Sequence, residues 1–261
     1  MISAAFVTLS REGALLLPRL THELADVDCY VHESVPRMEG CTSFAHVAEL
    51  TRRIFSKYRA LIYAAPCGIV VRSLDGCVIS KLTDPAVLVM DVRARWVISL
   101  LSGHEGGANT LAMRLANIFD AEPIVTTTTE AEKDLIVGIG CRRGVECARI
   151  MDAVRESLKR VEMPETRIRL LASASVKSDE AGLLRAAEEF GIPIRFISME
   201  QIRQCPFAVV RSEFVHKSIG VSAVAEPSAL LAGRRTRLIL PKTIYSSITV
   251  AIALESSSLL A

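Results

Sequence analysis

Residues 99–112 read SLLSGHEGGANTLA and place one histidine among three glycines, between an apolar run and a helical pattern. Histidine is the side chain that titrates near neutral pH, so His104 could accept a proton from water. Gly103, Gly106 and Gly107 let a ligand approach the main chain, and the free N–H groups at a helix start favour a carboxylate or phosphate. The pattern indicates an anion-binding turn with a proton acceptor. A plain glycine-rich turn is the alternative, and the spacing matches no nucleotide-binding fingerprint.

A second turn, VGIGCRRG at 137–144, also follows an apolar run and precedes a helical pattern. Gly140 opens the backbone here, and the guanidinium groups of Arg142 and Arg143 match carboxylates bidentately. The alternative is an exposed turn whose arginines are solvated. Cys141 could act as a nucleophile, but an isolated cysteine is more often a small packing residue.

A third polar stretch runs from GIVVRS at 68–73 to SKLTDP at 80–85, just before another apolar run. It contributes Arg72, Lys81, Thr83 and Asp84, although an aspartate before a proline is commonly a turn former. We interpret all three stretches as polar, partly basic turns at strand ends, which together suggest one large anionic ligand.

The segments around these turns alternate between strand-like and helix-like patterns, which predicts an α/β fold of parallel or mixed sheets covered by helices. In the first half we predict strands at 2–9, 28–32, 60–65, 86–91, 96–101 and 122–126. Helical spacing predicts helices at 11–24, 44–58 and 107–119. Pro18 weakens the first of these, because a proline inside a helix removes a hydrogen bond.

The polar run TTTTEAEK at 126–133 interrupts the alternation and is the best candidate for a linker. After it we predict strands at 134–139, 167–172, 193–198, 237–240 and 248–254. Helices are predicted at 145–161, 179–190, 199–204, 213–218 and 222–232. The chain is therefore expected to form two α/β domains, residues 1–129 with the SGHxGGAN motif and residues 134–261 with the GIGCRRG motif.

Composition excludes several classes of protein. Half of the 261 residues are hydrophobic and the net charge is +2, which favours a globular protein over a disordered or nucleic-acid-coating one. The longest apolar stretch, 61–71, is interrupted by Pro66 and Gly68 and is too short to span a bilayer. The first residues are interpreted as a strand, not a signal peptide. Seven cysteines without a C-x-x-C pair fit reduced thiols in a cytoplasm, and the scattered histidines argue against a structural zinc site.

Five ordered motifs now point to a family: GIVVRS (68–73), KLTDPAV (81–87), SLLSGHEGGAN (99–109), VGIGCRRG (137–144) and PKTIYSSITVAIA (241–253). The combination, spread over residues 2–254, resembles the cobalt-precorrin-5A hydrolase family of anaerobic cobalamin biosynthesis. The resemblance implies an enzyme that opens the δ-lactone of cobalt-precorrin-5A and releases acetaldehyde, giving cobalt-precorrin-5B. The substrate is a cobalt-bearing macrocycle fringed with acetates and propionates, which fits the anion-binding turns.

Within this reaction, His104 is our candidate for the catalytic base, with Asp84 as the next candidate and Asn109 as a further helper. Backbone N–H groups of Gly106 and Gly107 are expected to stabilise the oxyanion. Carboxylate binding is assigned to Arg72, Lys81, Arg142 and Arg143. The rest of the expected substrate site consists of Thr83, Ser102, Gly103, Gly106, Gly107, Asn109 and Gly140.

We expect the SGHxGGAN and GIGCRRG turns to line one cleft between the domains, because a macrocycle is too large for a single turn. No resident metal or organic cofactor is expected, since the cobalt arrives with the substrate. Expected partners are the tetrapyrrole, other enzymes of the pathway through channelling, and a second copy in a homodimer; nucleic acid and membrane are not expected.

One feature departs from the family pattern. Members usually carry a middle segment of several tens of residues, which here has shrunk to about 127–133, so the segment is either dispensable or replaced by a partner. Glu105 occupies a variable position of the motif and receives no role. Two other functions remain open: a non-catalytic tetrapyrrole carrier of the same pathway, which acetaldehyde release would exclude, and a phosphate-ligand protein, which displacement by phosphate would favour.

Overall fold

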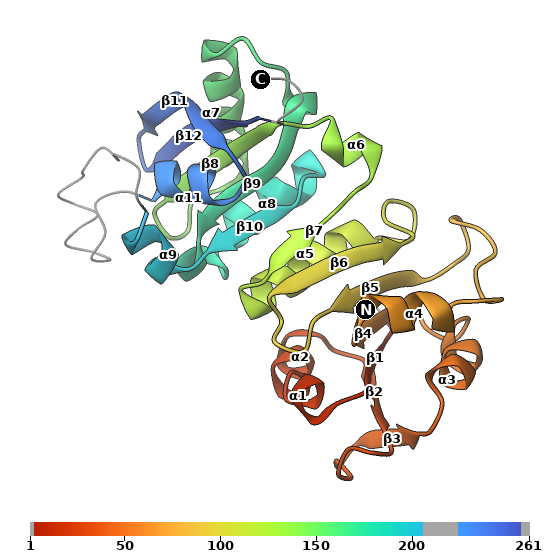
Figure 1. The fold of residues 1–261 in the computed structure, drawn as a ribbon. Helices are drawn as coiled ribbons and strands as arrows, with labels where there is room; N and C mark the ends of the chain where they lie inside the picture. Colours follow the sequence, from red (N-terminus) through yellow and green to blue (C-terminus); the bar gives the residue numbers. More distant parts are fainter. Residues whose placement is uncertain (1–2, 206–223, 257–261) are drawn as a thin grey trace. The chain divides into compact units, whose positions relative to one another are not determined.

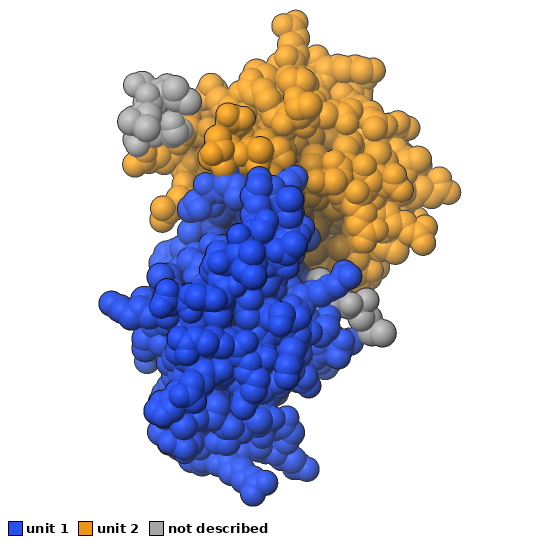
Figure 2. Space-filling view, turned by 90° about the vertical axis from the view of Figure 1, so that its right-hand side faces the viewer, with its two compact units in different colours: residues 1–127 blue, residues 128–261 orange. Residues whose placement is uncertain are grey.

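The computed structural model describes residues 3–205 and 224–256, and the chain divides into two compact units, Met1–Thr127 and Thr128–Ala261 (Figure 2). Each unit has its own sheet and its own apolar core. The helix predicted at 213–218 lies outside the described residues. The predicted α/β class with mixed sheets is confirmed.

Unit 1 is built on a seven-stranded sheet of order β3-β2-β1-β4-β5-β6-β7 (Figure 1). Its strands are β1 (Ala4–Thr8), β2 (Val27–His32), β3 (Cys41–Phe44), β4 (Ala60–Ala64), β5 (Ala86–Met90), β6 (Trp96–Leu101) and β7 (Glu122–Ile124). Neighbouring strands are parallel except β5 and β6, which are antiparallel. Their connection is short because Asp91 holds a tight turn, in which its Oδ1 accepts the N–H groups of Arg95 at 2.6 Å and Trp96 at 3.0 Å. So short a connection permits only an antiparallel pair.

Helices cover both faces of this sheet, because successive strand residues point to opposite sides. On one face Phe6 and Leu88 pack against α2 (Leu17–Glu23), which follows the short helix α1 (Arg11–Ala14), and against α5 (Ala108–Phe119). On the other face Val7 and Tyr63 pack against α3 (Val47–Ile54) and α4 (Cys67–Ser73). The central strands β1, β4 and β5 are consequently buried along their whole length.

Three predicted boundaries in unit 1 were wrong. The single helix predicted at 11–24 divides into α1 and α2, because Pro18 occupies the first turn of α2, where its missing N–H costs nothing. Phe44 ends a short edge strand, β3, so the helix predicted at 44–58 is only α3. The GIVVRS stretch, which is predicted to form a polar turn, instead lies in α4, whose N-cap is Pro66.

Unit 2 is built on a five-stranded sheet of order β10-β9-β8-β12-β11 (Figure 1). The strands are β8 (Leu135–Cys141), β9 (Ile168–Ala174), β10 (Ile194–Ile197), β11 (Thr236–Tyr245) and β12 (Ile248–Glu255). β8, β9 and β10 are parallel, whereas β12 is antiparallel to both β8 and β11. The sheet thus joins a parallel half to a hairpin.

The two faces of this sheet carry different helices. Val137 and Ile139 of β8 pack with α7 (Cys147–Arg160) and α8 (Ala181–Phe190). α9 (Met199–Arg203) and α11 (Ala225–Leu231) contribute to the core of the other face. α11 lies directly on β8 at Gly138, where a Cβ atom would be 2.0 Å from the carbonyl oxygen of Ala225. A strand glycine here permits a close approach of two backbones.

Some elements of unit 2 are longer or shorter than predicted. β8 continues to Cys141, so two of the glycines of the VGIGCRRG stretch belong to a strand. β11 runs to Tyr245 instead of ending at 240, with register shifts around Pro241, which cannot donate to the ladder. The expected linker includes a short helix, α6 (Thr128–Ala131), and two 3-10 turns, Glu165–Arg167 and Ser175–Lys177, flank β9. Within the described ranges, no helix has the length and apolar character needed to cross a membrane.

Candidate functional site

The reversal of β6 decides which of the predicted site residues meet in unit 1. β5 begins where β6 ends, so the loop that precedes β5 and the turn that follows β6 lie at the same end of the sheet (Figure 1). We call residues 78–84 the β5 entry loop and residues 102–107 the histidine turn. An ion pair joins them, with Lys81 Nζ 2.7 Å from Glu105 Oε1, and Gly106 lies so near the β5 entry loop that an added Cβ would be 3.4 Å from the carbonyl oxygen of Asp84.

The histidine turn is closed by its own backbone. Ser102 takes a left-handed conformation, with φ 57°, and its carbonyl oxygen accepts the N–H groups of Gly106 at 3.1 Å and Ala108 at 3.2 Å. The N–H of Gly107 donates to the carbonyl of His104 at 3.3 Å. The expectation that Gly106 and Gly107 offer free N–H groups to an oxyanion is therefore wrong for this conformation, because both donors are used inside the turn.

The side chain of Asn109, which follows the turn, is also hydrogen-bonded within the protein. Asn109 Oδ1 accepts the hydroxyl of Ser99 at 2.8 Å, and its Nδ2 donates to Thr127 Oγ1 at 3.0 Å. Asn109 thus ties α5 to β6 and to the segment after β7. Gly103 fits because a Cβ there would be 2.7 Å from Asn109 Oδ1. The hydroxyl of Ser102 is buried and has no hydrogen-bond partner among the described residues.

His104 projects from this framework as an exposed side chain. No hydrogen bond of its imidazole is found in the part of the chain that the structure describes, whereas the histidine of β2, His32, bonds to Ser34 and to the carbonyl of Ala45. The imidazole of His104 is therefore accessible to a ligand and to water. Such a position suits a proton acceptor, and it suits a group that only hydrogen-bonds a carboxylate equally well.

The β5 entry loop is fixed by Asp84, which is buried. One carboxylate oxygen of Asp84, Oδ2, accepts the N–H groups of Ile79 at 2.9 Å and Ser80 at 3.0 Å. The carbonyl of Ser80 in turn accepts the N–H groups of Thr83 and Asp84. Asp84 thus fixes the conformation of the loop. Because its carboxylate is used in these hydrogen bonds, it is less available for the catalytic helper role predicted for it.

The other residues of unit 1 that were predicted to bind the ligand make different kinds of contact. Lys81 is 73% exposed and pairs with Glu105, whose pKa is lowered by the hydrogen bond from that ammonium. Arg72 lies on α4, and its guanidinium donates to the carbonyl of Gly68 at 2.9 Å. Thr83 is exposed, with its hydroxyl 3.4 Å from the carbonyl of Ser80. The structure thus connects Lys81 to the histidine turn, while Arg72 and Thr83 make only local hydrogen bonds.

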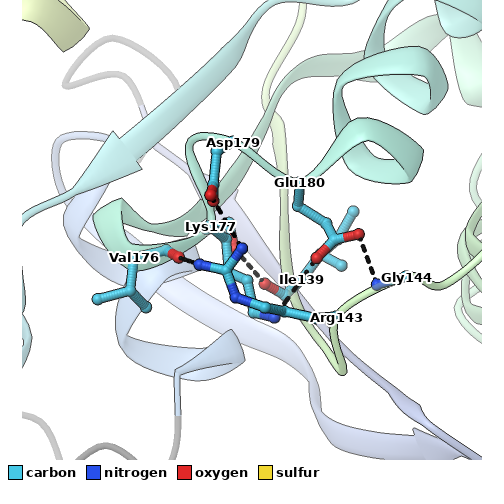
Figure 3. A network of polar contacts seen from close by, with 8 residues as sticks. Ile139, Arg143, Gly144, Val176, Lys177, Asp179 and Glu180 are labelled. Carbon is cyan, nitrogen blue, oxygen red and sulfur yellow. Dashed lines mark hydrogen bonds and ion pairs between the residues drawn. The ribbon is translucent and has the colours of Figure 1, made fainter.

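In unit 2 the GIGCRRG turn is held by the segment between β9 and α8 (Figure 3). Arg143 Nη1 lies 2.9 Å from Asp179 Oδ2, and its Nη2 donates to the carbonyl of Val176 at 3.2 Å. Glu180, which is buried, accepts the N–H of Gly144 at 2.9 Å with Oε1, and its Oε2 faces Lys177 Nζ at 3.7 Å. Arg143 therefore already has an internal carboxylate partner, Asp179. The hydrogen bond from the guanidinium lowers the pKa of Asp179.

The remaining predicted residues of unit 2 have distinct surroundings. Gly140 is buried inside β8 and pairs with Thr249, so it belongs to the strand and not to the turn. The backbone N–H of Arg142 donates to the carbonyl of Ser247 at 3.0 Å, which fixes the turn against the β11–β12 hairpin. Burial raises the pKa of the Cys141 thiol, which opposes the formation of a nucleophilic thiolate.

Sequence reasoning missed several residues that shape these turns. Glu105 was given no role, yet it joins the two segments of the unit 1 site. Lys177 and Glu180 organise the GIGCRRG turn. The signal was a charged run, VKSDE at 176–180, between a strand and a helix start. In the described parts of the chain, no three His, Cys, Asp or Glu side chains are grouped so that they could hold a metal ion.

The architecture defines a two-unit α/β protein whose polar turns lie at strand ends. Two family models match it: "Cobalamin synthesis G N-terminal" over residues 49–130 and "Cobalamin synthesis G C-terminus" over residues 135–253. The chain therefore belongs to the cobalamin synthesis G (CbiG) family, and its role lies in cobalamin biosynthesis.

Two named relatives agree with this assignment. The chain is 26% identical to a protein of Salmonella typhimurium named cobalt-precorrin-5A hydrolase, in an alignment 322 positions long that covers 88% of this chain and 91% of that protein. It is 23% identical to a protein of the same name from Priestia megaterium, with coverage of 80% and 82%. A solved structure of a cobalamin biosynthesis protein G homolog from Sulfolobus solfataricus is 21% identical over 97% of both chains, with a TM-score of 0.38.

The alignment with the Salmonella protein is longer than this chain, so that relative carries segments that this chain lacks. The two family models leave only residues 131–134 between them. The middle region is thus short here.

Proposed function

We propose that this protein is a cobalt-precorrin-5A hydrolase, which opens the δ-lactone of its substrate and releases acetaldehyde to give cobalt-precorrin-5B. The observation that carries the proposal is the likeness to relatives of that name over 80% or more of the chain. The exposed imidazole of His104 supplies a proton acceptor, and the adjacent Glu105 pairs with a cation, Lys81.

In this proposal His104 accepts a proton from water as the water oxygen attacks the lactone carbonyl. The bond between the acyl carbon and the ring oxygen breaks, and the proton on His104 passes to the leaving oxygen, which gives an alcohol and a carboxylic acid that ionises to a carboxylate. The imidazole then takes the alcohol proton, and the bond between the alcohol carbon and its oxygen becomes the carbonyl of acetaldehyde. The carbon–carbon bond to the ring breaks in the same step, and its electron pair stays with the macrocycle.

The oxyanion needs a donor other than the N–H groups of Gly106 and Gly107, which the turn uses itself. We assign this role to the buried hydroxyl of Ser102, which lacks a partner among the described residues and can donate once the turn opens. Lys81, which pairs with Glu105 of the histidine turn, keeps the carboxylate-binding role that its residue type predicts. No resident cofactor enters the proposal, since the cobalt belongs to the substrate.

The test is acetaldehyde release by the purified protein supplied with cobalt-precorrin-5A, followed with alcohol dehydrogenase and NADH. We expect acetaldehyde in equal amount to cobalt-precorrin-5B detected by mass spectrometry. Tight binding of the substrate without acetaldehyde would contradict the proposal and support a tetrapyrrole carrier instead.

A further inference from the structure

Exposed apolar side chains gather on one segment of unit 1. Nine large apolar side chains are exposed among the described residues, and five of them lie within residues 69–82. Three of the five belong to the β5 entry loop: Ile79 at 86%, Leu82 at 74% and Val78 at 50%. Single exposed apolar residues need no explanation, whereas a group of them usually marks a binding surface.

These side chains are held out by a rigid loop. The buried carboxylate of Asp84 accepts the N–H groups of Ile79 and Ser80, and the Ser80 hydroxyl accepts the N–H of Leu82 at 3.3 Å. A loop with its backbone fixed in this way cannot easily turn its apolar side chains inward. A ligand that covers them gains apolar burial without the cost of ordering the loop.

The same loop reaches the histidine turn. Lys81 stands between Ile79 and Leu82 in the sequence, and its ammonium pairs with Glu105 at 2.7 Å. The ion pair is exposed, with Lys81 at 73% and Glu105 at 32% of their side-chain surface. Exposed pairs contribute little free energy, so a ligand carboxylate can replace that of Glu105 at small cost.

We propose that Val78, Ile79 and Leu82 form the surface on which the apolar face of the tetrapyrrole lies, with Lys81 binding one of its peripheral carboxylates. The proposal rests on the proposed function for the choice of ligand. An apolar disc fringed with carboxylates complements a loop that presents apolar side chains around one cation. It places the ring edge beside His104, which is next to Glu105 in the histidine turn.

The experiment measures binding by calorimetry with two probes. Dicyanocobyrinic acid offers a corrin ring with free acetates and propionates, and mellitate offers dense carboxylates without a macrocycle. We expect the double variant Ile79→Ser, Leu82→Ser to bind dicyanocobyrinic acid about 10- to 100-fold more weakly, because each side chain loses its burial. Its affinity for mellitate should not change. Lys81→Met should weaken both probes by a few-fold.

The matched control is Leu15→Ser, since Leu15 is 71% exposed and follows α1 in the same unit; it should leave both affinities unchanged. Equal affinity of the double variant and the parent for dicyanocobyrinic acid would overturn the proposal. So would a parent dimer that the double variant converts to a monomer in sedimentation, because the loop would then contact a second copy. Acetaldehyde release by the parent protein is measured separately, so failure of the proposed function is distinguishable from failure of this surface.

Discussion

At the scale of single residues, His104 projects from a turn in which the N–H groups of Gly106 and Gly107 are already used. Replacing it separates the two roles that its exposed position allows. If it is the base, His104→Ala should lower kcat about 10²- to 10⁴-fold with little change in KM. His104→Gln should behave in the same way, because an amide keeps a hydrogen bond but does not accept a proton. Steady-state acetaldehyde release provides both constants.

A role of His104 in binding alone would give a different kinetic result. Near-normal kcat at saturating substrate with a raised KM would assign the imidazole to carboxylate binding. The base would then have to be sought elsewhere, and Asp84, the next candidate, would first have to free its carboxylate from the N–H groups of Ile79 and Ser80.

Glu105 offers a second test at this scale. The hydrogen bond from Lys81 lowers its pKa below the usual value for a glutamate. A carboxyl group whose pKa is lower in the folded protein stabilises that state above its unfolded pKa, and this contribution is lost as pH falls through the lowered value. Lys81→Met should therefore raise the pKa of Glu105 toward the ordinary value in a ¹³C NMR titration. Lys57→Met, which removes another exposed lysine of unit 1, should leave the pKa of Glu105 unchanged.

Persistence of the low pKa of Glu105 in the Lys81→Met variant would contradict the pairing. Because the carboxyl is exposed, the unfolding free energy should scarcely follow this titration. The expected effect is local: acid pH releases the β5 entry loop from the histidine turn.

Residue types located the polar turns better than they located the contacts within them. That Gly103 and His104 lie in a turn after a strand, with Asn109 at the start of the next helix, followed from the sequence alone. That Arg143 has Asp179 as a partner did not, because the two residues are far apart in the chain and meet only because the parallel neighbours β8 and β9 end at the same edge of the sheet. The same holds for Glu105, whose role depends on a loop that ends before β5 begins.

At the scale of elements, Gly138 shows how closely α11 lies on β8. Gly138→Ala would place a Cβ 2.0 Å from the carbonyl oxygen of Ala225, so α11 would have to move. We expect a loss of about 1–3 kcal/mol in the free energy of unfolding, typical of overpacking, measured by urea denaturation. Gly68→Ala in α4 is the matched control, because the nearest atom to its Cβ is the mobile end of Arg72 at 3.1 Å. An unchanged stability of Gly138→Ala would show that α11 is free to shift.

Apolar periodicity located most elements, and the exceptions share physical causes. α5 and α7 are long and amphipathic, so their helical pattern was unambiguous. α4 was missed because it is short and exposes Ile69 and Val71, which hides its periodicity. β3 was not predicted, because it is an edge strand of four residues with little buried surface; only its last residue, Phe44, fell within the predicted helix. Register and strand direction, including the reversal of β6, depend on pairing partners that no local pattern specifies.

At the scale of the whole molecule, each unit has its own sheet and core, which predicts that the units fold independently. Residues 1–127 and 128–261, expressed separately, should each unfold cooperatively in calorimetry and denaturant. Aggregation of either piece, or a lack of cooperative unfolding, would contradict that independence.

The separate units also test whether the histidine turn and the GIGCRRG turn serve one ligand, which stays a prediction. If they do, residues 1–127 alone should bind dicyanocobyrinic acid much more weakly than the full chain, and mixing the two pieces should restore part of the affinity. Equal affinity of residues 1–127 and the full chain would assign binding to unit 1 alone.

The short turn held by Asp91 has a consequence for how unit 1 reaches its folded state. Parallel neighbouring strands can pair only after the long connection between them has closed. β5 and β6 are joined by only a few residues, so they can pair locally on the microsecond timescale typical of hairpins. The open end of that hairpin carries the β5 entry loop and the histidine turn. The two segments thus come together through a local, early folding event, and their juxtaposition needs no other strand of the sheet to be in place first.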